Sequence, residues 1–324
     1  MKTKSPNLLF ALLLLWTGLA CAQPVSFGLF GDTPYNAWER ARLPELMAEM
    51  GREDLAFIVH DGDIKNGSSV CSDAVLLDIL AVFQASKHPL VYVLGDNEWT
   101  DCHRSNNGGY DPLERLAKLR QLFFQGSQAL GQRAMKLQRQ SDEVAGDRAF
   151  ATYRENVRWQ TGGALFVGLN LPGSENNYHG TTRKGGPVAE FVQRNAANQA
   201  WLAQAFALAR AQKSAGIMVV IQANPGIEDA NAGKALPGYR DFLNHLREET
   251  QGFAGQVVLV HGDSHQHQIN QPLRHASSGQ VLNNFTRVET FGSPQLGWIK
   301  ATVDASDPQV FRFLPRPWAT PTPQ

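Results

Sequence analysis

Residues 55–63 of this 324-residue chain read LAFIVHDGD, an apolar run that ends in a Gly-Asp pair. The same pattern recurs at residues 25–32, VSFGLFGD, and at residues 90–96, LVYVLGD. Helical patterns alternate with these runs, at residues 36–50 and 73–85. Short apolar strands that alternate with helices predict βαβ units and a parallel sheet.

The rest of the chain continues this pattern and then changes character. Further helices are expected at residues 111–124 and 188–211, and further strands at residues 164–169, 216–222 and 256–260. Between them, residues 125–147 are weakly patterned and predict a helical or loop insertion. Later runs resemble successive antiparallel strands, at residues 284–291, 297–303 and 309–313. We therefore expect one α/β domain over residues 23–314, with antiparallel strands toward its C-terminal end, and a proline-rich tail over residues 315–324.

The first 22 residues resemble a signal peptide. A positively charged start precedes an apolar core at residues 8–20, which is too short to cross a bilayer as a helix. Ala20-Cys21-Ala22 fits the small-residue cleavage pattern, so we expect a mature chain that begins at Gln23 and is periplasmic or extracellular. Lipoprotein processing at Cys21 is the alternative. No later stretch is apolar enough to predict a transmembrane helix.

Charge and composition exclude few functions. The chain is 43% hydrophobic and 19% charged, an ordinary globular composition. Its 30 basic residues balance 30 acidic ones, and loss of Lys2 and Lys4 with the signal peptide would leave 30 − 2 = 28 basic residues. Without a cationic excess, bulk charge argues against nucleic-acid binding. Composition leaves the oligomeric state open.

Two cysteines, Cys71 and Cys102, would remain after cleavage of the signal peptide. Export would place them in an oxidising compartment, where a pair of cysteines predicts one disulfide bond. Two buried free thiols are the alternative. Each cysteine follows a Gly-Asp pair within eight residues, so a bond between them would tie together two loops at the end of the sheet if their strands are neighbours.

Four acidic residues stand directly after a glycine and just beyond an apolar run: Asp32, Asp63, Asp96 and Asp263. The carboxyl ends of parallel strands face one common crevice, where ligands bind. Carboxylates gathered there repel each other, and a bound cation is the simplest way to neutralise them. Gly-Asp pairs are also common in turns, which explains any single pair without a ligand. Four such pairs favour a metal site.

Histidines cluster around the last of these acids, in His261-Gly262-Asp263-Ser264-His265-Gln266-His267. If this segment is extended, Asp263 and His265 share a face. His261 and His267 then have the same parity, so spacing alone leaves open which histidine joins the acids. Each of them is also compatible with an ordinary hydrogen-bonded histidine.

The order of these blocks resembles the calcineurin-like metallophosphoesterase superfamily. The family pattern is Asp-x-His, then Gly-Asp, then Gly-Asn-His-acid, then a single His, then Gly-His-x-His. The matching blocks lie in the same order between residues 28 and 267: Gly31-Asp32-Thr33-Pro34, Gly62-Asp63, Gly95-Asp96-Asn97-Glu98, Ala223-Asn224-Pro225 and Gly262-Asp263-Ser264-His265. The resemblance implies a two-sheet α/β sandwich with flanking helices and two divalent metal ions.

Ligand roles carry over from the family only where residues match. The resemblance implies that Asp32 and His265 bind the first metal and that Asp63 bridges both metals. Asp96 stands where the family has its metal-binding Asn, and Asn97 stands where the family has its catalytic His. A shift of one residue would make Asn97 the ligand instead.

Three family histidines are replaced in this chain. Pro34 stands in the first block and Asp263 in the last, while Gln222 or Asn224 is the nearest oxygen donor to the missing single His. The second metal site would therefore be built from oxygen donors, Asp263 among them. Such a site favours Mg²⁺, Mn²⁺, Fe or Ca²⁺ over Zn²⁺.

The resemblance implies an exported hydrolase that cleaves a small phosphomonoester or phosphodiester with a metal-activated water. Asn97 can donate a hydrogen bond but cannot act as a general acid near neutral pH. His103 and Arg104 follow closely and are candidates to supply that donor or to hold the phosphate, with Asn224 and His179 as further candidates. The alternative is a catalytically inactive binding protein of the same fold, which the lost histidines favour and the retained acids oppose.

Overall fold

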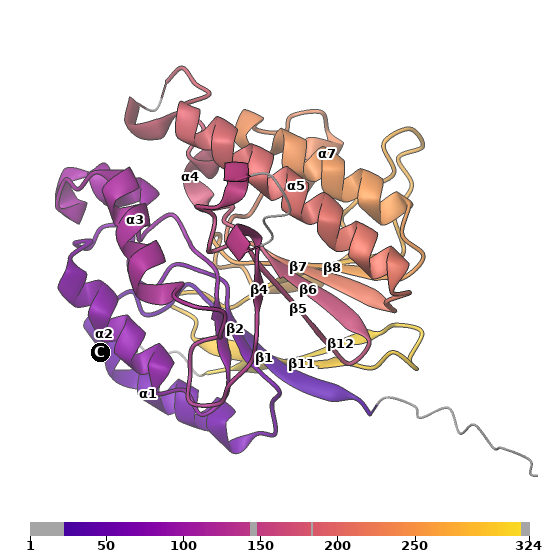
Figure 1. Ribbon diagram of the computed structural model, residues 1–324, viewed down its shortest axis with the longest axis horizontal. Coiled ribbons are helices and arrows are strands. Elements are labelled where there is room, and N and C mark those ends of the chain that lie inside the picture. The colour runs from indigo at the N-terminus through magenta and orange to yellow at the C-terminus, as the bar shows by residue number, and fades with distance from the viewer. Residues whose placement is uncertain (1–22, 143–147, 183, 319–324) are drawn as a thin grey trace, which may run out of the picture.

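The computed structural model describes residues 23–142, 148–182 and 184–318, so the expected signal peptide lies outside the described residues. Two mixed β-sheets pack face to face, with helices on both outer faces. Figure 1 shows α1, α2 and α3 on one side of the sheets and α5 and α7 on the other. The two-sheet α/β sandwich expected from the sequence is therefore confirmed.

The five-stranded sheet has the order β12-β11-β1-β2-β3. Strands β1, β2 and β3 are parallel, whereas β11 pairs antiparallel with β1 and β12. The strands are β1 (Val25–Phe30), β2 (Ile58–His60), β3 (Leu90–Tyr92), β11 (Gly297–Val303) and β12 (Phe311–Pro317). The helices over this sheet are α1 (Ala37–Arg52), α2 (Asp73–Gln84) and α3 (Pro112–Phe123). Helix α1 begins after Asn36, whose side chain accepts a hydrogen bond from the backbone N–H of Glu39.

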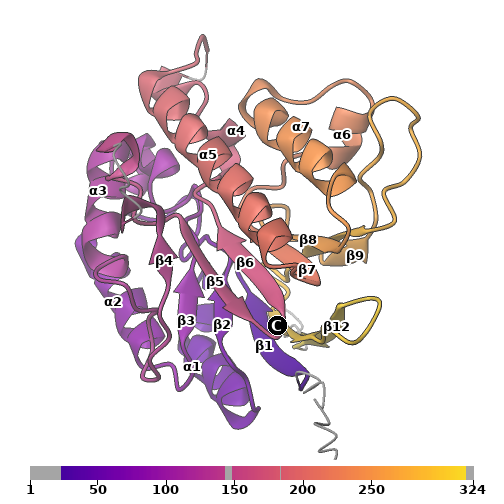
Figure 2. The same ribbon diagram turned by 45° about the vertical axis from the view of Figure 1, so that its right-hand side comes forward.

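The seven-stranded sheet has the order β4-β5-β6-β7-β8-β10-β9, with β6, β7, β8 and β10 parallel. Its strands are β4 (Gln138–Arg139), β5 (Val157–Thr161), β6 (Ala164–Gly168), β7 (Gly216–Val220), β8 (Gln256–His261), β9 (Gln268–Asn270) and β10 (Phe285–Glu289). Figure 2 shows α5 (Ala189–Ala211) and α7 (Pro237–Gln251) lying over this sheet. The shorter helices are α4 (Gly173–Asn176), α6 (Ile227–Asn231), η1 (Thr100–His103), η2 (Ser105–Asn107), η3 (Gln140–Asp142), η4 (Arg148–Phe150) and η5 (Gly180–Thr182).

Apolar side chains fill three layers, one between the sheets and one under each set of helices. Between the sheets, the rings of Phe27 and Phe57 stack with their centroids 4.9 Å apart. Both faces of the central strands β1, β2, β6, β7 and β8 are thus largely buried, which explains why these strands are nearly continuous apolar runs. Polar side chains that follow the buried central strands can reach solvent or a ligand at the strand ends.

Three features of the fold differ from the sequence-based expectation. The run at residues 284–291 forms β10, which is parallel to β8 in the other sheet rather than antiparallel to β11. Apolar periodicity reports burial and carries no information on strand direction. Strand β12 continues through Pro315 to Pro317, past the expected start of the tail at residue 315. Proline is tolerated there because β12 is an edge strand. The sequence analysis also missed α7, β5 and β9.

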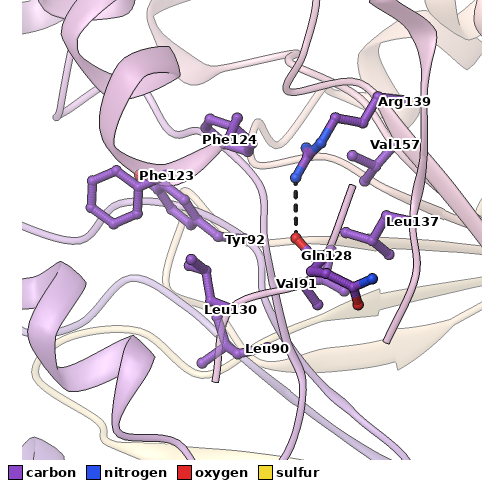
Figure 3. Close-up of a pocket in the computed structure, with 11 residues that line it drawn as sticks. Leu90, Val91, Tyr92, Phe123, Phe124, Gln128, Leu130, Leu137, Arg139 and Val157 are labelled. Atoms are coloured by element: carbon purple, nitrogen blue, oxygen red, sulfur yellow. Dashed lines mark hydrogen bonds between the residues drawn. The ribbon is translucent and has the colours of Figure 1, made fainter. Parts of the chain in front are cut away.

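One cavity lies among the apolar side chains of the fold. Figure 3 shows a small cavity lined mostly by apolar side chains, where Arg139 donates to the carbonyl oxygen of Gln128 at 3.3 Å. Its volume of about 10 Å³ holds about one water molecule. This cavity is therefore too small for a substrate. Within the described residues, no helix is long and apolar enough to cross a membrane.

Cys71 and Cys102 form a disulfide bond, as the sequence predicts, with their Cα atoms 5.8 Å apart. Cys71 lies in the loop after β2 and Cys102 in the segment after β3, and these two strands are neighbours. Both side chains are fully buried. The bond therefore fixes two loops that leave the same end of the sheet.

We expect reduction of this disulfide to lower the free energy of unfolding by about 3 kcal/mol, because the bond closes a loop spanning 31 residues in the unfolded chain. Urea unfolding with and without dithiothreitol measures the change. The double variant Cys71→Ser/Cys102→Ser is the control, and its stability should not respond to the reductant. Equal stability of the oxidised and reduced wild-type protein would contradict the expectation.

Candidate functional site

The four strand-end carboxylates meet at one end of the two sheets. Asp32, Asp63 and Asp96 follow β1, β2 and β3, and Asp263 follows β8 of the other sheet. The backbone N–H of Asp263 donates to both carboxylate oxygens of Asp32, at 3.1 and 3.2 Å. A Cβ atom at Gly173 would lie 2.7 Å from an oxygen of Asp263 and 2.8 Å from an oxygen of Asp96. The structure therefore brings together the acids that the sequence singled out, and only glycine fits between two of them.

Backbone strain is concentrated in this site. Asp32, Asp63 and Asp263 adopt positive φ angles of 47°, 60° and 75°, in the left-handed region. Residues other than glycine visit this region rarely, although Asp tolerates it better than most. Such strain persists where the surrounding structure enforces it, which is common at functional sites.

His265 is the histidine that faces the acids. It also has a positive φ of 57°, so residues 263–265 are not extended and the condition for the parity argument is not met. Its Nε2 lies 3.6 Å from an oxygen of Asp32, and its Nδ1 is 2.6 Å from the carbonyl oxygen of Ser293. By contrast, His261 is fully buried and His267 stacks on Phe291. The tertiary structure thus identifies His265 as the histidine beside the acids, which residue spacing alone left open.

Tyr35 was not foreseen, yet its hydroxyl lies at the centre of the site. The hydroxyl donates to Asp63 Oδ2 at 2.6 Å and lies 3.4 Å from Asp32 Oδ1. It accepts from Asn97 Nδ2 at 2.9 Å and is 3.2 Å from His265 Nε2. The sequence held one signal, because Tyr35 directly follows the proline that replaces the family's first histidine.

The third block holds the ends of β2 and β3 together. Asn97 donates through Nδ2 to Asp63 Oδ2 at 2.6 Å and through its backbone N–H to Asp63 Oδ1 at 3.1 Å. Glu98, which the sequence analysis left without a role, accepts from the backbone N–H of Gly95 and from the hydroxyl of Tyr92, both at 2.6 Å. It also accepts from the backbone N–H of Asp63 at 3.2 Å. Glu98 therefore positions both strand-end acids.

The amide side chain next to the acids is that of Gln222 rather than Asn224. Gln222 Nε2 lies 3.4 Å from Asp263 Oδ1, and its Oε1 accepts from the backbone N–H of Gly173 at 2.6 Å. Asn224 contacts Asp263 through its backbone N–H at 3.0 Å, whereas its side chain donates to Ser264. Of the two amides left open by the sequence, Gln222 has its side chain nearer the acids, with its nitrogen toward Asp263 and its oxygen toward Gly173.

His103 and Arg104 lie beside the acids rather than among them. Arg104 pairs with Asp101 at 2.6 Å, and Asp101 accepts a hydrogen bond from the hydroxyl of Ser174 at 2.7 Å. The same Ser174 hydroxyl is 2.7 Å from Asp96 Oδ2. Asp101 and Ser174, which the sequence analysis did not select, thus connect Arg104 to the carboxylate site, whereas His103 Nδ1 is 2.8 Å from the carbonyl oxygen of Thr100.

Burial and mutual repulsion dominate the electrostatics. Burial, followed by the charges of Asp96 and Glu98, raises the pKa of Asp63 well above its usual value. Burial also raises the pKa of Asp32, against its contact with His265. Desolvation and the charges of Asp96 and Asp32 raise the pKa of Asp263 to about 8. Carboxylates at this site therefore need protons or a cation to balance them.

The donor atoms of this site suit a divalent cation, but they are not arranged as a complete metal site. Among the described residues, no three His, Cys, Asp or Glu side chains gather closely enough to hold a metal ion. The point between Asp32, Asp63 and His265 is taken by the hydroxyl of Tyr35. Metal binding there requires this hydroxyl to become a ligand or to move aside. The donors are carboxylate, phenol, amide and one imidazole, which suit an oxygen-preferring cation.

Comparison with solved structures identifies the fold. No protein-family model matches this chain, and no curated protein is significantly similar to it in sequence. A dimetal phosphatase from Danio rerio is similar in structure with a TM-score of 0.53 at 15% identity, over 90% of this chain and 99% of that one. PhoD gives 0.52 at 14% identity over 88% of this chain and 65% of its own. A purple acid phosphatase from yellow lupin gives 0.51 at 14% identity over 91% and 54%.

These structures belong to one fold group, and the likeness extends over about nine tenths of this chain. The chain has the calcineurin-like metallophosphoesterase fold, as its ordered sequence blocks indicated. At such low sequence identity the likeness establishes the fold, and the chemistry has to be argued from the residues of the site.

We expect the metal-free protein to lose stability as the pH rises from about 4 to about 8. Folded Asp263 retains its proton up to about pH 8, whereas the unfolded chain releases it near 3.8. The folded state binds more protons across this window, so the free energy of unfolding falls as the pH rises. Urea unfolding in EDTA measures this slope. Asp263→Asn should flatten it, and a rising stability over the same window would contradict the expectation.

Proposed function

We propose that this protein is a metal-dependent phosphoesterase that hydrolyses a small phosphomonoester or phosphodiester. The observation that supports it is the meeting of Asp32, Asp63, Asp96 and Asp263 at one end of both sheets. Among the residues that the structure describes, the only ion pair of these four acids is that of Asp32 with His265. The names of the structural neighbours, phosphatases of which one is described as dimetal, support the same chemistry.

Two groups of side chains are the proposed metal ligands. Asp32, His265 and Tyr35 would hold the first cation. Asp96, Asp263 and Gln222, or Asn97 in place of Asp96, would hold the second, with Asp63 shared by both. When bound, the divalent cations supply positive charge for the phosphate and lower the pKa of a water. Mg²⁺, Mn²⁺, Fe and Ca²⁺ suit this oxygen-rich set better than Zn²⁺.

The remaining steps fall to side chains of the chain itself. His265 is oriented by the carbonyl oxygen of Ser293 and presents its Nε2 to the site. Asn97 Nδ2 is a donor for a phosphate oxygen, but it cannot release a proton near neutral pH. We assign protonation of the leaving oxygen to His103 in η1, whose Nδ1 is 2.8 Å from the carbonyl oxygen of Thr100. Arg104 is the guanidinium available to the phosphate or the leaving group.

A catalytically inactive binding protein is the second candidate. The observation in its favour is the Tyr35 hydroxyl, which lies where the first cation would be. Desolvation and the charges of Asp63 and Asp32 raise the pKa of Tyr35 well above 10, so the phenol keeps its proton while no cation is bound. In such an inactive protein, the phenol of Tyr35 takes the position of the first metal ion and blocks it.

Export is part of the proposal. The signal-peptide pattern of residues 1–22 predicts it, and the Cys71–Cys102 disulfide bond is compatible with an oxidising compartment. A periplasmic or extracellular location follows, with lipidation at Cys21 as the alternative.

The decisive test combines metal content and turnover. Purified mature protein is analysed for bound metal and assayed on aryl phosphate monoesters and diesters with Mn²⁺ or Mg²⁺. We expect Asp63→Asn to lower turnover by about 100-fold or more, because it removes the shared ligand. The control is Asp54→Asn, a change at an exposed aspartate outside the site. Bound metal without turnover on a broad panel would favour the inactive protein, and no metal binding would overturn both readings.

Tyr35→Phe separates the two roles of the phenol. If the hydroxyl is a ligand, the variant should bind Mn²⁺ about tenfold more weakly in a calorimetric titration. Tyr110→Phe is the matched control, since the Tyr110 ring packs under Arg115 outside the site. Tighter Mn²⁺ binding by Tyr35→Phe would show that the hydroxyl blocks the site instead.

A further inference from the structure

A polar hollow of about 310 Å³ lies beside the carboxylate site. Its walls come from η1 and from the segment around α4, and they include Asp101, His103, Arg104, Ser174, Glu175 and His179. None of the described residues that line it is aliphatic or aromatic apart from the two histidines. Its volume falls at the lower end of the range for small-molecule sites.

Ser174 connects the hollow to the proposed reaction site. Its side chain is exposed in the hollow, and its hydroxyl contacts Asp96 Oδ2 and Asp101 Oδ1, both at 2.7 Å. Arg104 Nη2 approaches the same hydroxyl at 3.5 Å. The hollow is therefore the space next to Asp96 that is open to the rest of a substrate whose phosphate lies near this acid.

A left-handed turn fixes the shape of the hollow. Four successive residues without a glycine, 174–177, have φ angles between 49° and 55°. The fully buried Arg194 of α5 holds this turn, since it donates to the carbonyl oxygens of Asn170 and Asn176 at 2.9 Å. Tyr239 adds a hydroxyl that accepts from the backbone N–H of Asn176 at 3.2 Å. An unfavourable backbone held in this way is preorganised for a ligand.

The charges in the hollow disfavour an anionic occupant. Asp101 and Glu175 oppose the single guanidinium of Arg104, so the formal charge is −1 when both histidines are neutral. Carboxylates, imidazoles and hydroxyls offer closely spaced donors and acceptors, which match alcohol groups. Phe, Tyr and Trp are absent from the described lining, so a quaternary ammonium would find no ring to stack on. An aliphatic chain would gain no apolar contact there.

We propose that this hollow binds the alcohol part of the substrate and that this alcohol is a polyhydroxylated group, such as a sugar or the ribose of a nucleoside. The inference rests on the proposed phosphoesterase function and specifies its substrate class. Glu175 and His179, which contact each other at 3.1 Å, are the residues assigned to recognition of the hydroxyls.

The test compares esters that differ in hydroxyl groups. A hexose 6-phosphate and n-hexyl phosphate both release a primary alcohol of similar length, so their difference in kcat/KM reports contacts to the hydroxyls. We expect the hexose ester to be favoured about tenfold or more over the hexyl ester with the Mn²⁺-loaded protein. A 5′-nucleotide distinguishes a nucleoside site from a sugar site. Equal rates for the hexose and hexyl esters, or a preference for ethanolamine phosphate, would overturn the proposal.

Two variants locate the selectivity in the hollow. Glu175→Gln and His179→Ala should each lower the hexose-to-hexyl ratio of kcat/KM about tenfold. His275→Ala is the matched control, because His275 lies outside the hollow and hydrogen-bonds to Ser277. An unchanged ratio in both hollow variants would also overturn the proposal.

If the protein is not a phosphoesterase, the assays give a different result from the one expected when only the proposal for the hollow is wrong. In that case an aryl phosphate, whose release needs no contact with the hollow, is not hydrolysed either. Calorimetric binding of the hexose phosphate and the hexyl phosphate then tests the hollow alone. Tighter binding of the hexose ester that Glu175→Gln weakens would support the hollow, and equal binding of both esters would exclude it.

Discussion

The repulsion among carboxylates that are withdrawn from water is the constraint on which the rest of the site depends. β1, β2 and β3 deliver Asp32, Asp63 and Asp96 to the point where β8 of the other sheet delivers Asp263. Because the central strands are buried on both faces, their ends are the places where polar side chains can gather. A site of this kind is unfavourable by itself and becomes favourable when protons or cations occupy it.

The surrounding structure is arranged to keep these acids in place. Glu98 ties the ends of β2 and β3 together, and the Cys71–Cys102 bond holds the loops that follow them. Asp32, Asp63 and Asp263 have left-handed backbone angles, and such strain persists where the surrounding structure enforces it. The strained residues are therefore also the proposed site residues, and contacts that enforce strain of this kind also preorganise a site.

Much of the fold follows from local sequence patterns, and the rest depends on which strands pair with each other. The helix starting after Asn36 and the strands β1 and β3 are visible as periodicity and capping in the sequence. The direction of β10 and its membership of the second sheet are not, because an apolar run looks the same in either sheet and in either direction. Helix α7 was overlooked although its pattern is local, since Tyr239, Phe242, Leu243 and Leu246 are buried at helical spacing after Pro237. The three-residue β9 is too short to show a period and depends on its pairing with β10.

Residue type and order along the chain were enough to predict an α/β domain, four acids at strand ends and a Cys71–Cys102 bond, with two free thiols as the alternative. The two-sheet sandwich was implied by the resemblance of the ordered blocks to metallophosphoesterases. Only the tertiary structure decided that His265 rather than its neighbours faces the acids, and that Tyr35 lies among them. It also decided that Ser174 joins the site to a polar hollow. The physical reason is that these contacts join residues far apart in the chain, through left-handed turns that no spacing rule describes.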